Sequence, residues 1–131
     1  MPIPKEQKAL ILDHVPGMAP LLVELADEVG IKAKAVSSIA AFKDSFTQIQ
    51  PSIICLDCEI PQQDIPPLMV WMSSARADRA IPPPKLILVS ATEEQSILLK
   101  KYAENIGIQV VAEFDKTADI DEVREVLKSV T

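Results

Sequence analysis

Four polar residues stand where short apolar runs of the sequence end: Asp13, Asp57, Ser90 and Lys116. Aspartate carboxylates can hold a hard divalent cation, and an aspartate can also act as a nucleophile toward phosphorus. A hydroxyl group and an ammonium group can then bind the new phosphoryl oxygens and neutralise part of their charge. Together the four residue types indicate phosphoryl-transfer chemistry, provided that the fold brings them to one place.

The segments before these residues have the pattern of buried strands, and the segments between them have the pattern of amphipathic helices. Strands buried on both faces appear as continuous apolar runs, whereas a helix repeats apolar residues roughly every three to four positions. We therefore predict strands at 8–12, 31–36, 52–56, 86–89 and 108–114, and helices at 18–29, 39–49, 67–76, 93–105 and 120–130.

The predicted helices also have predicted ends and inward faces. We expect Ser37 or Ser38 to cap the second helix and Thr117 or Asp119 to cap the last one. The apolar residues expected to face inward are Ile97, Leu98, Tyr102 and Ile106 on the fourth helix, and Ile120, Val123, Val126, Leu127 and Val130 on the last.

Alternation of strands and helices predicts an α/β fold with a parallel sheet wrapped by helices on both faces. Right-handed crossovers favour the strand order 2-1-3-4-5, and ligands bind such a sheet beyond the carboxyl ends of its strands. Asp13, Asp57, Ser90 and Lys116 all lie at that edge. The predicted fold therefore brings the four residues together.

Composition limits the classes of function. A length of 131 residues fits one domain, 1–131, and 48% hydrophobic with 24% charged residues is typical of a globular chain. The net charge of −6 and the lack of a basic run argue against nucleic-acid binding. No apolar run approaches the roughly 20 residues that span a bilayer, so we expect no membrane insertion. With no signal peptide and only Cys55 and Cys58, a cytoplasmic location is expected.

Beyond these patterns, the sequence resembles CheY-like response-regulator receiver domains from about Lys8 to Val130. Ile53-Ile54-Cys55-Leu56-Asp57-Cys58-Glu59-Ile60-Pro61 is similar to the phosphoacceptor strand and the loop after it. Leu10-Ile11-Leu12-Asp13-His14 is similar to the first strand with its acids, and Leu88-Val89-Ser90-Ala91 to the strand that ends in a hydroxyl residue and alanine. Lys116 falls where the family's lysine stands.

The resemblance implies a three-layer, doubly wound, flavodoxin-like (βα)5 fold and a role in two-component or phosphorelay signalling. It implies that Asp57 accepts a phosphoryl group from a histidine kinase or a comparable signalling protein. Asp13, Asp57 and the backbone carbonyl of Glu59 would hold Mg²⁺, and Ser90 and Lys116 would contact the phosphoryl group. An output protein or domain would bind at the fourth helix, the fifth strand and the last helix.

The sequence departs from the family pattern at several positions. His14 replaces one of two adjacent metal-binding acids, so we expect Mg²⁺ to bind only weakly. Thr117 follows the lysine in place of a proline, and we expect that peptide bond to be trans. Glu113 occupies the position of the switch aromatic, and Phe114 should point to the opposite face of the strand. Ser90 and Lys116 are 26 positions apart, which predicts a longer fourth helix or following loop.

These departures keep an alternative open: a pseudo-receiver, with the same fold acting as a binding module without phosphorylation. An enzyme or a nucleotide-binding protein is disfavoured, because the sequence has no G-x-G-x-x-G or G-K-[S/T] loop. Cys55-Leu56-Asp57-Cys58 spells C-x-x-C, but residues three apart on a strand face opposite sides. We therefore expect Cys55 in the core and Cys58 in a loop, and we expect His14 on the surface.

Overall fold

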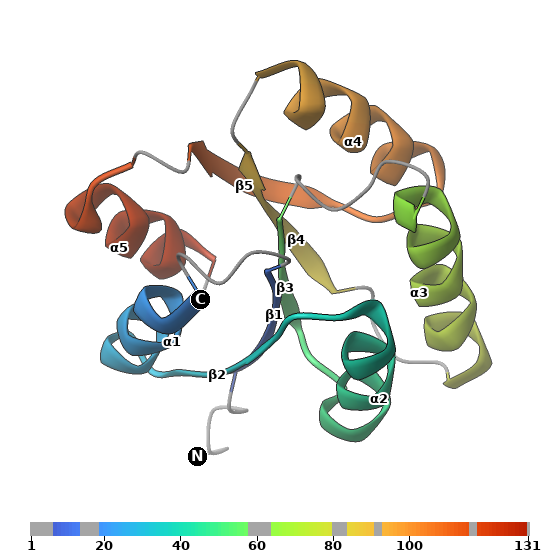
Figure 1. Ribbon diagram of the computed structural model, residues 1–131, viewed down its shortest axis with the longest axis horizontal. Helices are drawn as coiled ribbons and strands as arrows, with labels where there is room; N and C mark the ends of the chain where they lie inside the picture. Colours follow the sequence, from blue (N-terminus) through green and yellow to red (C-terminus); the bar gives the residue numbers. More distant parts are fainter. Residues whose placement is uncertain are drawn as a thin grey trace, which may run out of the picture.

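The computed structural model describes residues 7–13, 19–57, 64–79, 84–90, 93–115 and 118–130. A sheet lies between two layers of helices (Figure 1). Its strands are β1 (Gln7–Leu12), β2 (Ile31–Val36), β3 (Ile53–Asp57), β4 (Lys85–Ser90) and β5 (Val110–Asp115). Its helices are α1 (Ala19–Glu28), α2 (Ile39–Ile49), α3 (Ile65–Arg79), α4 (Glu93–Asn105) and α5 (Ile120–Ser129).

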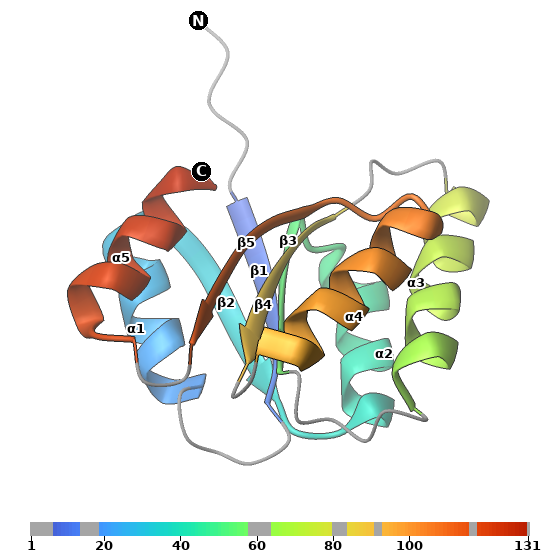
Figure 2. The same ribbon diagram turned by 90° about the horizontal axis from the view of Figure 1, so that it is seen from above.

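All strand pairs in the sheet are parallel, and the strand order is β2-β1-β3-β4-β5. The predicted topology is thus confirmed. In Figure 1 the sheet runs from β5 at the top to β2 at the bottom, with α1 and α5 on the left and α2, α3 and α4 on the right. Figure 2 shows the same sheet from above, with β5 at the near edge.

The core has two parts, one on each face of the sheet. Even-numbered residues of β1, such as Leu10 and Leu12, pack with Phe42, Phe46 and other side chains of α2, α3 and α4. The odd-numbered residues of β1 pack on the other face, against α1 and α5; that cluster includes Ala9, Ile11, Leu22, Val123 and Leu127. Because both faces of β1 and β3 are covered, these strands carry the continuous apolar runs seen in the sequence.

Local signals set several helix ends. The Ser38 hydroxyl accepts a hydrogen bond from the Ala41 N–H at 3.1 Å and caps α2. The Asp119 carboxylate accepts one from the Glu122 N–H at 2.8 Å, so Asp119 caps α5. After α1 the chain turns at Gly30 with φ of 84°, a backbone conformation that residues other than glycine rarely adopt.

Helix α3 is longer than predicted. It begins at Ile65 rather than at Pro67, and it continues to Arg79 where the sequence predicted a loop from residue 77. Prolines are tolerated in the first turn because the amides there have no partner within the helix. Pro66 and Pro67 therefore both fit in the first turn, and proline alone did not locate the start of the helix.

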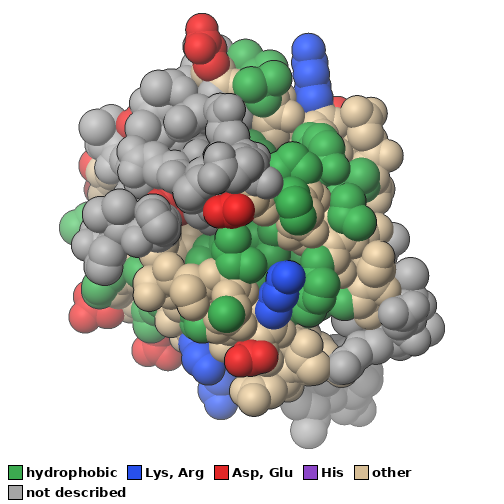
Figure 3. Space-filling model, turned by 45° about the vertical axis from the view of Figure 1, so that its right-hand side comes forward, with side chains coloured by type: hydrophobic (Ala, Val, Ile, Leu, Met, Phe, Trp, Pro, Cys, Tyr) green, Lys and Arg blue, Asp and Glu red, His purple; other side chains and the backbone are tan. Residues whose placement is uncertain are grey.

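The inward face of α4 was predicted only in part: Tyr102 and Ile106 pack against the core as expected, but Ile97 and Leu98 do not. Ile97 and Leu98 are 46% and 61% exposed, whereas Ser96, Leu99 and Ala103 are buried. In this orientation Leu99 and Ala103 pack in the core, and the Ser96 hydroxyl donates a hydrogen bond to the carboxylate of Glu113 on β5. Figure 3 brings the right-hand side of Figure 1 forward and shows a group of hydrophobic side chains on that side of the molecule.

Strand β5 and helix α5 differ from the prediction in smaller ways. Strand β5 begins at Val110 instead of Ile108, and Ile120 is 48% exposed instead of facing inward. Leu86 lies opposite Val110 and Ile87 lies opposite Ala112, so Val111 forms an irregularity with one extra residue in β5.

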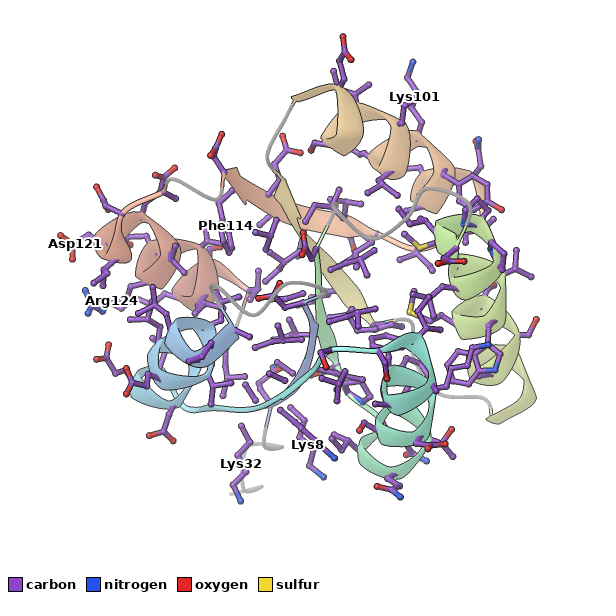
Figure 4. All side chains as sticks on the ribbon, in the orientation of Figure 1. Lys8, Lys32, Lys101, Phe114, Asp121 and Arg124 are labelled. Atoms are coloured by element: carbon purple, nitrogen blue, oxygen red, sulfur yellow. The ribbon has the colours of Figure 1, made fainter. Side chains whose placement is uncertain are left out.

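Helices α1 and α5 are also joined by charge. The Arg124 guanidinium on α5 donates to Glu28 of α1 at 2.9 Å and to Asp121 at 2.8 Å (Figure 4). The two carboxylates raise the pKa of Arg124, Glu28 contributing more. No helix in the described ranges is both long enough and apolar enough to cross a membrane.

The buried aromatic pair of α2 gives a test of the core. Phe42 is fully buried, with its ring centroid 6.0 Å from that of Phe46. We expect Phe42→Ala to lower the free energy of unfolding by about 3–5 kcal/mol, because it removes packing and leaves a cavity. Leu98→Ala, at an exposed site, should change it by no more than about 0.5 kcal/mol. Urea unfolding followed by circular dichroism measures both, and equal losses would contradict the assigned core.

Candidate functional site

Asp13 and Asp57 lie side by side at the carboxyl edge of the sheet. Strands β1 and β3 are parallel with Leu12 opposite Leu56, so the next residue on each strand is an aspartate. Neighbouring strands are about 4.8 Å apart. Asp13 is 7% exposed and Asp57 is 2% exposed. The two strands thus bring the two buried aspartates to the same edge of the sheet, where the sequence pattern placed them.

Three elements hold Asp13 in place. Its N–H donates to the Val36 carbonyl at the end of β2, at 3.1 Å. Its Oδ2 atom accepts a hydrogen bond from the N–H of Ala19, the first residue of α1, at 3.1 Å. A helix N-terminus stabilises a negative charge through its unpaired amides and its dipole. The carboxylate is thus oriented by β1, β2 and α1 together.

Ser90 reaches the same edge from β4. Asp57 lies opposite Val89, so Ser90 is one residue beyond Asp57 on the neighbouring strand. Ser90 in turn lies opposite Asp115 at the end of β5, and Lys116 is the next residue in the sequence. The backbone of Ser90 is described, but its side chain is not.

Several predicted features lie outside the described residues: the carbonyl of Glu59, Lys116, His14, Cys58 and the bond before Thr117. Within the described ranges, no cluster of three or more histidine, cysteine or acidic residues could by itself hold a metal ion. The two carboxylates of Asp13 and Asp57 nonetheless have the donor chemistry that a hard divalent cation prefers. The described part of the site therefore fits such a cation with two of the three predicted ligands.

Sequence reasoning missed the polar contact between α4 and β5. Ser96 is 4% exposed, and its hydroxyl donates to the Oε2 atom of Glu113. The available signal was the spacing of Ser96 with Leu99 and Ala103, which places this serine on the buried stripe of the helix. Phe114, the next residue on β5, packs on the opposite face in the cluster of α1 and α5, as predicted (Figure 4).

Cys55 belongs to the core rather than to a reactive site. It is 2% exposed in the middle of β3, and burial raises the pKa of its thiol from 9.0 to about 12. A neutral, inaccessible thiol is a poor nucleophile and a poor metal ligand. The prediction that Cys55 is a packing residue is confirmed.

Comparison with solved structures identifies the fold. The receiver domain of an HD domain-containing protein from Pseudomonas fluorescens Pf-5 superposes with a TM-score of 0.72 at 13% identity, covering 95% of this chain and 94% of that one. A CheY-like receiver domain from Methanospirillum hungatei JF-1 gives 0.68 at 16% identity, with 95% and 92% covered. A CheY-like receiver domain from Methylobacillus flagellatus gives 0.67 at 22% identity, with 95% and 98% covered.

No family model matches the sequence, and no curated protein sequence matches it. The likeness is therefore one of structure at low sequence identity. It shows that the chain has the fold of CheY-like receiver domains, which confirms the fold that the sequence resemblance implied.

The buried thiol makes the free energy of unfolding depend on pH. The unfolded thiol has a pKa near 9.0 and the folded one about 12, so the unfolded chain loses its proton first as pH rises. The stability that Cys55 contributes should be complete below about pH 9 and should be lost progressively up to about pH 12. Urea unfolding below and above pH 9 should therefore show a larger loss for the wild type than for Cys55→Ala.

A labelling experiment on Cys58→Ala, which retains Cys55 alone, completes this test. The thiol should react with an aromatic disulfide reagent only in denaturant. Rapid labelling of the folded protein, or identical pH profiles for the wild type and Cys55→Ala, would contradict the assignment.

Proposed function

We propose that this chain is a signal-transduction receiver domain of a two-component or phosphorelay system, and that Asp57 is its phosphoacceptor. The observation that carries the proposal is the pair of buried carboxylates, Asp13 and Asp57, at the carboxyl edge of a receiver fold. The proposed activity is protein–protein signalling rather than catalysis on a small substrate, and its proposed location is the cytoplasm, where a histidine kinase would present its phosphohistidine.

In the proposed transfer, a carboxylate oxygen of Asp57 forms a bond to the phosphorus atom of a phosphohistidine. The phosphorus–nitrogen bond breaks, and the imidazole leaves with the electron pair and takes up a proton. The position of Asp57 at the strand end supports this role, because an attacking oxygen there faces the edge where ligands of parallel sheets bind. The hydroxyl of Ser90 and the ammonium of Lys116 would contact the transferred group.

The new phosphoryl group would add negative charge beside Asp13, so the charge must be offset. Asp13, Asp57 and the backbone carbonyl of Glu59 would hold Mg²⁺ for this purpose. When bound, the cation supplies electrostatic stabilisation of the phosphoryl oxygens. His14 supplies no hard oxygen ligand, and we therefore propose weak binding of the metal.

One observation favours the pseudo-receiver as the second candidate. Glu113 accepts a hydrogen bond from Ser96, and Phe114 is packed on the opposite face of β5. With no aromatic side chain on the α4 side at position 113, no aromatic rotamer change is available there to carry a signal. In this alternative the fold binds its partner in one state, and Asp57 remains unmodified.

The surface proposed for the output partner has more exposed acidic residues than exposed lysines, which are Lys100, Lys101 and Lys128 in its described part. It comprises α4, β5 and α5, and its exposed carboxylates are Glu94, Glu104, Glu113, Asp115, Asp119, Asp121, Glu122 and Glu125. Ile97, Leu98 and Ile120 add exposed apolar area. A partner protein with basic residues around an apolar centre would complement this surface.

Phosphotransfer from acetyl phosphate tests the acceptor. In the presence of Mg²⁺ and acetyl phosphate, the intact mass of the wild type should rise by one phosphoryl group. Asp57→Ala should gain none, whereas Asp44→Asn, which alters an exposed acid on α2, should gain as much as the wild type. Modification of Asp57→Ala would place the acceptor elsewhere. An unmodified wild type that still binds its partner would support the pseudo-receiver.

The charge of the output surface predicts how association depends on salt. Binding of an output partner should slow as ionic strength rises, because screening weakens long-range attraction. At low salt, Glu122→Lys/Glu125→Lys should slow association, whereas Glu24→Lys/Asp44→Lys, the same change of charge on α1 and α2, should have a smaller effect. Stopped-flow rates measure both. Salt-independent rates would argue against this surface.

A further inference from the structure

The two outer strands of the sheet carry opposite charges. Strand β2 exposes Lys32 and Lys34, whereas β5, at the other edge, exposes Glu113 and Asp115. In each strand the two charged residues are separated by one residue, so they project from the same face of that strand. The two edges of one molecule thus present matching pairs of charges of opposite sign.

Both charged pairs also lie on the same face of the sheet. Lys34 lies opposite Leu10 on β1, and Leu10 belongs to the core on the side of α2, α3 and α4. Glu113 contacts Ser96 of α4 and therefore lies on that side as well. Figure 4 shows Lys32 next to Lys8 at the start of the neighbouring strand β1. If the sheet continued into a second copy, lysines and carboxylates would meet on one face.

The outward backbone groups of β2 follow from its pairing with β1. The Val36 carbonyl accepts a hydrogen bond from the Asp13 N–H, so Val36 directs its backbone toward β1. Directions alternate along a parallel strand, so every second residue before Val36 does the same. The residues between them, including Ala33 and Ala35, direct their N–H and carbonyl groups to the outer edge.

The outward groups of β5 follow in the same way from β4. The Leu86 N–H donates to the carbonyl of Gln109, which directly precedes β5, so the backbone groups of Leu86 point toward β5. Because directions alternate along a strand, the backbone groups of Leu88 point toward β5 as well. Leu88 lies opposite Glu113, and in a parallel pair the residue opposite directs its own backbone away. Glu113 and, two residues on, Asp115 therefore point their backbone groups to the outer edge.

We propose that copies of this chain associate edge to edge, with β5 of one copy pairing in parallel with β2 of the next. In this arrangement Glu113 lies opposite Lys32 and Asp115 lies opposite Lys34, each acid meeting a lysine across the new strand pair. The outward backbone of Glu113 bonds Ile31 and Ala33, as parallel pairing requires. In this one register the charged side chains of β5 and β2 lie on the same face of the sheet, their backbone groups point toward each other, and their charges are opposite.

The same charges exclude the competing pairings of identical edges. Two β2 strands would bring lysines together, and two β5 strands would bring carboxylates together. Lysines on an edge strand commonly prevent such contacts, but they do not repel an acidic edge. The contact is therefore head to tail, and it extends into a chain of copies unless the rotation between copies closes a ring. It does not depend on phosphorylation of Asp57.

Charge reversal tests the proposal on the full chain. At low salt, the average mass from sedimentation should rise with protein concentration for the wild type and for Asp57→Ala. Lys32→Glu/Lys34→Glu and Glu113→Lys/Asp115→Lys should each remain monomeric, with association weakened at least tenfold. An equimolar mixture of these two variants should associate again, because each edge then meets its opposite. Lys100→Glu/Lys101→Glu, the same change of charge on exposed residues of α4, should associate like the wild type.

Circular dichroism confirms that each variant is folded before its average mass is measured by sedimentation. A wild type that stays monomeric at every concentration would overturn the proposal. Association that survives both edge variants, or a mixture that fails to associate when both variants are folded, would overturn it as well.

Discussion

The parallel pairing of β1 with β3 is the interaction on which the rest of the structure depends. These two strands are buried on both faces, so their apolar residues anchor both halves of the core. The same pairing sets Asp13 beside Asp57 in a place with little solvent. Two like charges that are close and poorly hydrated repel each other, and such a pair favours a cation or an incoming positive group. The strand pairing that joins the two halves of the core therefore also brings the two buried aspartates together.

Much of this arrangement was predictable from the sequence because it depends on local pattern. An apolar run that ends on an aspartate indicates a buried strand followed by a polar residue. The alternation of strands with helices indicates a parallel sheet, and the polar residues meet at the carboxyl edge of that sheet. The face of α4 was not predictable in this way, because it buries a serine whose partner, Glu113, lies 17 positions further along the sequence. The irregularity at Val111 likewise arises from pairing with β4 and leaves no local mark.

Strand β5 belongs to both proposed interfaces. Its carboxylates belong to the surface offered to an output partner, and they also complement the lysines of β2. A partner docked over β5 would cover the edge needed for contact with another copy, so the two complexes exclude each other. In such a system the concentration of partner sets the degree of self-association, since both draw on the same free edge.

Helix α5 closes the side of the sheet that α1 covers only in part. Val123, Leu127 and Val130 complete the cluster around Ile11 and Ile53, and Arg124 joins the last helix to the first. During synthesis, at about 5–20 residues per second, this face of β1 and β3 therefore stays partly open to water until α5 has left the ribosome. The nascent chain must keep two strongly apolar strands from aggregating until α5 arrives.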